Sequence, residues 1–221
     1  MNPTHSTRGY KHRSPIEAAR PQYDNLLKRP IPMRPPHSVH PNSIILTFSG
    51  ARLDLQAPAV ELITLRDIAH ALSRIGRFCG AGDHIATVAQ HCVHVSLLCS
   101  PECARWALLH DASEAYLGDV SSPLKSLLPE YQHLEEIWQD AISTRFGVPC
   151  VNVKQWDVKS MLTERRDNGP YFMTDAEWLG LSPDTPTPEP DSIPWTAWST
   201  ARAEAIYLAR AEQLGIYDDA T

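Results

Sequence analysis

Residues 104–118 read ARWALLHDASEAYLG, an apolar run that turns abruptly ionisable at His110-Asp111. Small and aliphatic side chains recur there at helical spacing, which predicts a helix that starts beyond Pro101 and ends near Leu117-Gly118. A hydrophobic core does not require an imidazole and a carboxylate side by side. The pair is therefore the first candidate for chemistry in this sequence.

Apolar positions spaced by three and four residues predict further helices on both sides of this segment. They are expected from Thr64 to Cys79–Gly82, over about 85–98, from Ser122-Pro123 to about 128, over 134–146, over 153–166 and over 198–215. Ahead of them, residues 44–55 carry β-branched or alternating apolar residues on either side of Ser49-Gly50, a pattern typical of a short β-hairpin. The sequence thus predicts an all-α helical bundle with a small N-terminal β-hairpin.

Residues 1–43 are expected to form a flexible, disordered tail outside this bundle. They hold eight of the 19 prolines and seven basic against two acidic residues, so their net charge is +5, whereas the remainder carries −11. Such a segment cannot bury enough apolar surface to order itself. Residues 44–221 are then a single domain, in which the proline-rich stretch 183–194 is a loop.

Composition excludes several classes of protein. No run approaches the roughly 18–20 apolar residues of a membrane span, and the polar N-terminus lacks the apolar centre of a secretory signal. We therefore expect a cytoplasmic protein with no membrane partner. The five cysteines form no CxxC pair and predict neither a disulfide framework nor a cysteine zinc site. The acidic body disfavours a nucleic-acid partner.

A metal site is predicted where other ionisable residues can join His110-Asp111. His91 lies on the preceding helix and can converge with this pair from a neighbouring position. A carboxylate from a later helix would complete two nitrogen and two oxygen ligands, for which Asp157 is the best candidate, with Glu164 and Asp167 as rivals. Such a set suits one divalent ion, Mn²⁺, Co²⁺, Fe²⁺, Ni²⁺, Zn²⁺ or Mg²⁺, and does not choose among them.

The pattern of His91, His110-Asp111 and Asp157 resembles the H…HD…D signature of the HD-domain superfamily of metal-dependent phosphohydrolases. The stretch from His110 to Lys125, with its HDxxE, GD and PLK motifs, is similar to the small bacterial 5′-deoxynucleotidases. It is still more similar to prophage-encoded single-domain HD phosphohydrolases, over roughly residues 44–215. The resemblance implies an HD-domain fold and hydrolysis of a phosphate ester, with the ion positioning the phosphate and a water molecule.

The resemblance implies catalytic roles for two acids near the metal residues. Glu114 follows His110 by four residues and Asp111 by three, so it shares their face of the expected helix. It would orient or deprotonate the attacking water. Asp119, in the turn after that helix, would contact the same water, the leaving hydroxyl or a sugar hydroxyl.

Three further residues are expected to bind substrate. Lys125 lies in the first turn after the Ser122-Pro123 helix start, where a phosphate would meet both its ammonium and free backbone N–H groups. Arg77 and Phe78 resemble the Arg-aromatic pair of the family, so Arg77 would clamp a phosphate and Phe78 would face the base or sugar. Arg74, three residues earlier, could substitute for Arg77.

The expected activity is cleavage of a nucleotide. Two reactions remain open: a nucleoside monophosphate gives nucleoside and phosphate, or a deoxynucleoside triphosphate gives nucleoside and triphosphate. The alternatives are a non-catalytic metal- or nucleotide-binding sensor and an alarmone hydrolase, although the latter typically shows HDxxED, whose last acid is Ala115 here. The resemblance also suggests a homodimer.

Overall fold

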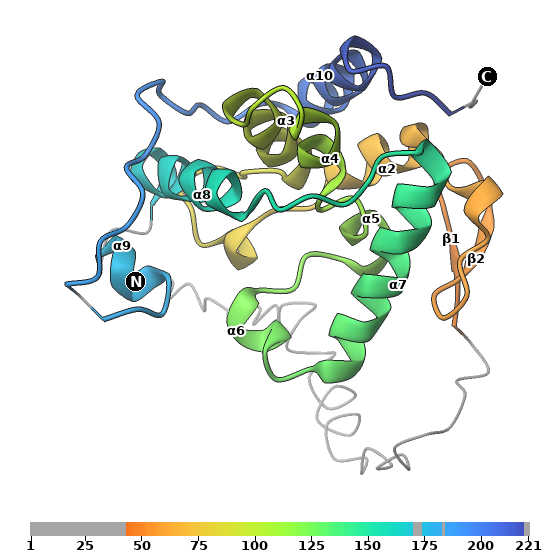
Figure 1. Cartoon of the computed structure of the whole chain (residues 1–221), viewed down its shortest axis with the longest axis horizontal. Helices are drawn as coiled ribbons and strands as arrows, with labels where there is room; N and C mark the ends of the chain where they lie inside the picture. The colour runs from red at the N-terminus through yellow and green to blue at the C-terminus, as the bar shows by residue number, and fades with distance from the viewer. Residues whose placement is uncertain (1–42, 170–173, 183, 219–221) are drawn as a thin grey trace, which may run out of the picture. The chain divides into compact units, whose positions relative to one another are not determined.

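A computed structural model describes residues 43–169, 174–182 and 184–218. The expected tail, apart from its last residue, lies outside the described residues. Strand β1 (Ile44–Leu46) pairs antiparallel with β2 (Arg52–Asp54), and Ile45 is opposite Leu53 (Figure 1). The predicted hairpin around Ser49-Gly50 is therefore confirmed.

The rest of the described chain is mostly helical, which confirms the all-α expectation. Its elements are the 3-10 turns η1 (Val60–Leu62) and η2 (Phe78–Gly80) and the helices α2 (Leu65–Leu72), α3 (Val88–Leu98), α4 (Ala104–Leu109), α5 (Glu114–Leu117), α6 (Ser122–Lys125), α7 (Pro129–Phe146), α8 (Lys154–Asn168), α9 (Asp175–Trp178) and α10 (Thr200–Gln213). Local chemistry explains several ends. Thr64 and Thr87 accept hydrogen bonds from the first turns of α2 and α3, and Gly147, with φ 59°, ends α7 in the left-handed region.

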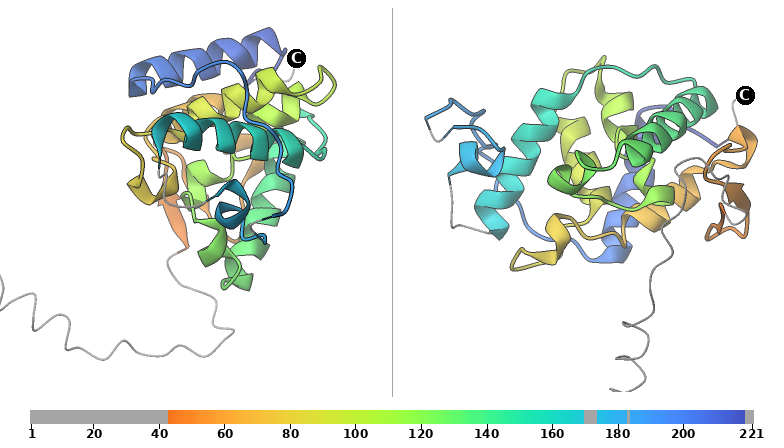
Figure 2. Two further views of the ribbon diagram at one scale, coloured as in Figure 1. Left: turned by 90° about the vertical axis from the view of Figure 1, so that its left-hand side faces the viewer. Right: turned by 90° about the horizontal axis from the view of Figure 1, so that it is seen from below.

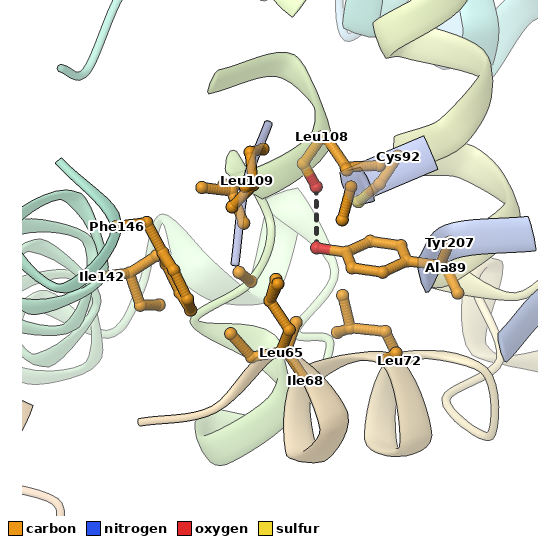
Figure 3. Packing of buried hydrophobic residues seen from close by; sticks show 14 of the residues in the cluster. Leu65, Ile68, Leu72, Ala89, Cys92, Leu108, Leu109, Ile142, Phe146 and Tyr207 are labelled. Carbon is orange, nitrogen blue, oxygen red and sulfur yellow. Dashed lines mark hydrogen bonds between the residues drawn. The ribbon is translucent and has the colours of Figure 1, made fainter. Parts of the chain in front are cut away.

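Helix α3 lies at the centre of the bundle. It packs against α4, α8 and α10, and the views in Figures 1 and 2 agree on this arrangement. Figure 3 shows the core beside it, where aliphatic residues of α2 and α4 meet Phe146 of α7 and Tyr207 of α10. The hydroxyl of buried Tyr207 donates a hydrogen bond to the carbonyl of Leu108 at 2.9 Å. The core thus surrounds the helices that carry the candidate ligands.

Several helix boundaries differ from the sequence prediction: α6 ends at Lys125 rather than near 128, and α7 begins at Pro129 rather than near 134. Helix α2 ends at Leu72 rather than near residues 79–82, and α3 begins at Val88 rather than near 85. Between them the backbone pairs with itself: the N–H of Arg77 donates to Ala86 O at 2.8 Å, and Val88 N–H donates to Ile75 O at 3.1 Å. This bridge uses the backbone groups that a longer α2 would have needed.

A connection across α8 and α3 follows the proline-rich stretch. Residues 184–194 contain neither helix nor strand, as a loop requires. We call residues 191–198 the strap. Two of its backbone amides donate to Thr163 and Asp167 of α8, each at 2.7 Å. The side-chain amide of Gln90 on α3 forms two hydrogen bonds with the backbone of the strap, at 2.8 and 2.9 Å. The strap therefore ties α8 to α3.

Two general features of the described chain bear on its class. None of its helices combines the length and the apolar character that crossing a membrane requires. The thiols of all five cysteines are free.

Helix α9 was not predicted, although the capping box of Thr174 and Glu177 that begins it is a recognisable signal.

The loop before α3 offers a stability test at Gly82. A Cβ there would lie 2.3 Å from the side-chain nitrogen of Asn168, a buried residue that also bonds the backbone of His84 through both amide atoms, at 2.7 and 2.8 Å. We expect Gly82→Ala to lower the free energy of unfolding by about 1–3 kcal/mol in urea titrations. Gly76→Ala, whose Cβ meets only Ile85 at 3.5 Å, is the control and should change it by less than about 0.5 kcal/mol. Equal losses in the two variants would contradict this account.

Candidate metal centre

His91, His110 and Asp111 come together where α3 meets the turn after α4. One donor atom from each of the three lies within 4.8 Å of the others. Both imidazoles are buried, with 0% of His91 and 9% of His110 exposed. The cluster could hold a metal ion, as the sequence predicts for these three residues.

The turn that carries His110 and Asp111 is a correction to the predicted helix. The helix expected from beyond Pro101 to Leu117 is broken between α4 and α5, at residues 110–113. Hydrogen bonds of the tighter i to i+3 type cross the break, among them Glu114 N–H to Asp111 O at 3.0 Å. Glu114 is therefore not one regular turn along a continuous helix from Asp111.

The hydrogen bonds of the two imidazoles leave the same ring nitrogen of each available. His91 Nδ1 lies 2.7 Å from Glu164 Oε1, and His110 Nδ1 donates to the carbonyl of Ala107 at 2.8 Å. Among the described residues, neither Nε2 atom has a partner in hydrogen-bonding geometry, although both are buried. A buried nitrogen without a partner is unfavourable, and a metal ion is a standard way to satisfy it.

The spacing of the donor atoms fits one ion. Asp111 Oδ2 lies 3.2 Å from His110 Nε2 and 3.7 Å from His91 Nε2, and Asp157 Oδ1 lies 3.2 Å from His91 Nε2. Donors bound about 2.1 Å from one ion, at angles of about 90–110°, lie roughly 3.0–3.4 Å apart. The observed distances fall in or just beyond that range.

The geometry separates Asp157 from its two rivals. Asp157 approaches Nε2 of His91, whereas Glu164 contacts Nδ1 on the other side of the same ring. An ion on Nε2 cannot also reach the carboxylate on Nδ1. Asp167 accepts hydrogen bonds from Arg166 and from the strap instead. Asp157 is thus the carboxylate of α8 that lies beside the cluster.

Charges inside the centre compensate one another. Burial works against the charged forms, but the interaction of His110 with Asp111 outweighs it, so the pKa of His110 is raised well above its usual value and that of Asp111 is lowered. Burial likewise opposes charge on His91, yet Glu164 and Asp157 raise its pKa. The pKa of Asp157 is lowered by His91 despite its burial. A divalent cation bound to the two Nε2 atoms would replace the imidazole protons in balancing these carboxylates.

Glu114 and Asp119 both belong to this charged region. Burial, with repulsion from Asp111 and Asp119, raises the pKa of Glu114 to about 10. Its Oε2 atom is buried with no hydrogen-bond partner among the described residues. Asp119, half-buried after α5, has its pKa raised by burial and by Asp111, against the influence of Arg77. Both carboxyl groups therefore face the charge of Asp111.

The structure places Arg77 in the centre and Phe78 at its edge. The Nε atom of Arg77 donates to Glu164 Oε2 at 2.9 Å, and its Nη1 atom lies 3.7 Å from Asp111 Oδ2. Phe78, with φ 58°, packs edge-on against Trp178 of α9 at 5.9 Å between ring centroids. Arg74 instead pairs with Glu204 of α10, so it does not replace Arg77.

Two lysines pair with carboxylates in this region. Lys125 of α6 donates a hydrogen bond to Glu135 of α7 at 2.5 Å. Burial lowers the pKa of Lys125, but the carboxylate of Glu135 outweighs burial and raises it. Its ammonium is thus already paired, which the sequence did not predict. Exposed Lys154 donates to Asp157 Oδ2 at 2.9 Å and was not singled out from the sequence.

Glu164 and Ser160 also belong to the site, although the sequence named Glu164 only as a rival metal ligand and did not single out Ser160. Ser160 donates to Glu164 Oε1 at 3.0 Å and lies 3.3 Å from His91 Nδ1. A signal for both exists in the chain. Ser160 follows Asp157 by three residues and Glu164 follows it by seven, which places all three on one face of α8.

No family model matches the chain. It is 44% identical over 130 residues to the uncharacterized protein YfdR of Escherichia coli (strain K12), a match that covers 58% of this chain and 73% of that protein. It is also 40% identical over 114 residues to the uncharacterized protein RCAP_rcc00048 of Rhodobacter capsulatus, covering 47% of this chain and 58% of that protein.

Metal binding can be tested by thermal unfolding. We expect saturating Mn²⁺ or Co²⁺ to raise the melting temperature, since a ligand at 100 times its Kd stabilises the folded state by about 2.7 kcal/mol. His110→Ala should lose this shift because it removes a donor. His133→Ala, at an exposed histidine of α7, is the control and should retain it. A full shift in His110→Ala would mean that the ion binds elsewhere.

Proposed function

This chain belongs to the family of the Escherichia coli protein YfdR, and we propose that it is a metal-dependent phosphohydrolase of the HD-domain type that cleaves a phosphate ester of a nucleotide. Either a nucleoside monophosphate yields nucleoside and phosphate, or a deoxynucleoside triphosphate yields nucleoside and triphosphate. His91, His110, Asp111 and Asp157 would hold one divalent ion.

One observation carries the proposal. Two buried imidazoles each have Nδ1 engaged and Nε2 unsatisfied, and carboxylate oxygens of Asp111 and Asp157 lie 3.2–3.7 Å from those Nε2 atoms. Two nitrogen and two oxygen donors leave further coordination positions for solvent and substrate, as a catalytic rather than a purely structural site requires.

Catalysis would divide between the ion and the acids around it. The ion would lower the pKa of a water molecule beside it and stabilise charge on phosphate oxygens. Glu114 is the candidate base, because its unpartnered Oε2 atom can accept a proton from water. Its pKa of about 10 reflects burial and the charge of Asp111, and a cation on Asp111 would lower it. Asp119 would contact the same water or a hydroxyl of the substrate.

An anionic substrate must find positive charge in a site rich in carboxylates. One positive charge is the guanidinium of Arg77, close to Asp111. A second is the ammonium of Lys125, which lowers the pKa of Glu114 and of Asp119. These two residues would bind the phosphate. Phe78, half-buried beside Arg77, would face the base or sugar.

The activity is tested by offering deoxy- and ribonucleotides, as mono- and triphosphates, with Mn²⁺, Co²⁺ or Mg²⁺. Release of phosphate or of triphosphate is scored separately, which distinguishes the two reactions. Turnover that requires the added ion supports the proposal. A protein that binds the ion and turns over no nucleotide would instead be a sensor.

Glu114→Gln separates chemistry from metal binding. The amide keeps the shape of the side chain but cannot take up a proton, so we expect kcat to fall by about 10²–10⁴-fold with unchanged affinity for Mn²⁺. Asp111→Asn should lose both the ion and turnover. Glu130→Gln, at an exposed glutamate of α7, is the control for the loss of one negative charge. If Glu114→Gln keeps near-normal kcat, another group is the base.

Lys125→Met tests the proposed phosphate contact. Removing an ionic hydrogen bond is worth about 1.5–3 kcal/mol, so we expect KM to rise by about tenfold or more, while Mn²⁺ affinity stays the same. Arg52→Met removes a positive charge from the exposed side of the hairpin and should leave KM unchanged. A KM unaffected in Lys125→Met would show that Lys125 does not bind the phosphate.

A further inference from the structure

The carboxylate of Glu164 is fully buried beside the candidate metal centre. Its side chain is 0% exposed on α8. Its counterion is the guanidinium of Arg77, whose Nε atom lies 2.9 Å from Glu164 Oε2, so the carboxylate belongs to a buried ion pair. An ionised carboxylate without water is unfavourable unless its partners are well placed.

The partners of Glu164 divide between its two oxygens. Oε1 lies 2.7 Å from His91 Nδ1 and accepts a hydrogen bond from Ser160 at 3.0 Å. Oε2 accepts one from Arg77 Nε at 2.9 Å. One carboxylate therefore connects a candidate metal ligand to the nearest arginine, across segments that lie 73 and 87 residues away in the sequence.

We propose that Glu164 is a positioning residue that fixes the imidazole of His91 with Nε2 toward the ion and holds Arg77 within the same site. The proposal rests on the proposed metal-dependent function. Glu164 itself does not contact the ion, because it occupies the opposite ring nitrogen of His91. It acts by selecting the tautomer with hydrogen on Nδ1 and by increasing the basicity of Nε2.

A purely structural reading makes Glu164 only the counterion of Arg77. That reading does not explain why the second oxygen, Oε1, lies 2.7 Å from His91 Nδ1 and not beside Arg77. It also does not explain why Ser160 supports the oxygen that faces His91. The two roles predict different outcomes once Arg77 is removed.

The experiment measures Mn²⁺ affinity by calorimetry on the full chain, together with the visible absorption spectrum of the Co²⁺ form. Partners of metal-binding histidines typically contribute 10- to 100-fold to metal affinity, so we expect Glu164→Gln to weaken Mn²⁺ binding by about that factor and to alter the Co²⁺ bands. Arg77→Met should leave the Mn²⁺ affinity within about threefold of the original, since His91 keeps its partner. The double variant should bind as weakly as Glu164→Gln.

Controls keep the result interpretable. The double variant removes both buried charges together, so it serves the same comparison if the uncompensated Arg77 prevents Glu164→Gln from folding. Asp67→Asn alters another buried carboxylate, which holds Ser49 of the hairpin turn at 2.7 and 2.8 Å. It should lower the melting temperature without changing Mn²⁺ affinity.

Two results would overturn the positioning role alone: Glu164→Gln binding Mn²⁺ as tightly as the original chain, or the double variant regaining the original affinity. Failure of the unaltered chain to bind Mn²⁺, Co²⁺ or Zn²⁺ would instead remove the proposed function, and the positioning role with it. The two failures are therefore distinguishable from the first titration.

Discussion

Charges at the meeting point of α3, α4 and α8 have almost no water to solvate them, and the rest of the structure depends on how they are compensated. Glu164 is balanced by Arg77 and His91, and Asp111 by His110. Each pair crosses between segments or sits at a helix break, so the electrostatics and the packing must form together. The two histidines use Nδ1 in hydrogen bonds, whereas their Nε2 atoms face Asp157 and Asp111 at 3.2 Å without one.

Much of the fold follows from local sequence patterns. The hairpin follows from alternation around Ser49-Gly50, and α7 from its apolar spacing and from Gly147, which can adopt the left-handed conformation at its end. The premature end of α2 does not follow, because its apolar spacing continues to Ile75. That helix stops where the backbone pairs with residues 86–88 instead, a contact that periodicity alone cannot reveal.

The candidate site, like the fold, was only partly predictable from the sequence. His91, His110 and Asp111 could be found from the sequence because ionisable residues interrupt apolar helices, and the structure brings them together. Spacing alone left Asp157 and Glu164 as rivals, since both lie on one face of α8. Only the two sides of the His91 ring distinguish them. The pairing of Lys125 with Glu135 likewise depends on how α6 turns against α7, which no local pattern encodes.

The strap has a consequence for how the protein is made. It joins α8 to α3 by hydrogen bonds between residues as far apart as Gln90 and Trp198. A nascent chain on the ribosome would hold His91, His110 and Asp111 long before the strap has been synthesised. Because contacts of such large sequence separation close late, we expect the growing polypeptide to tie α8 to α3 only after residues 191–198 have been synthesised. A chain that terminates before the strap would therefore lack the hydrogen bonds that join α8 to α3.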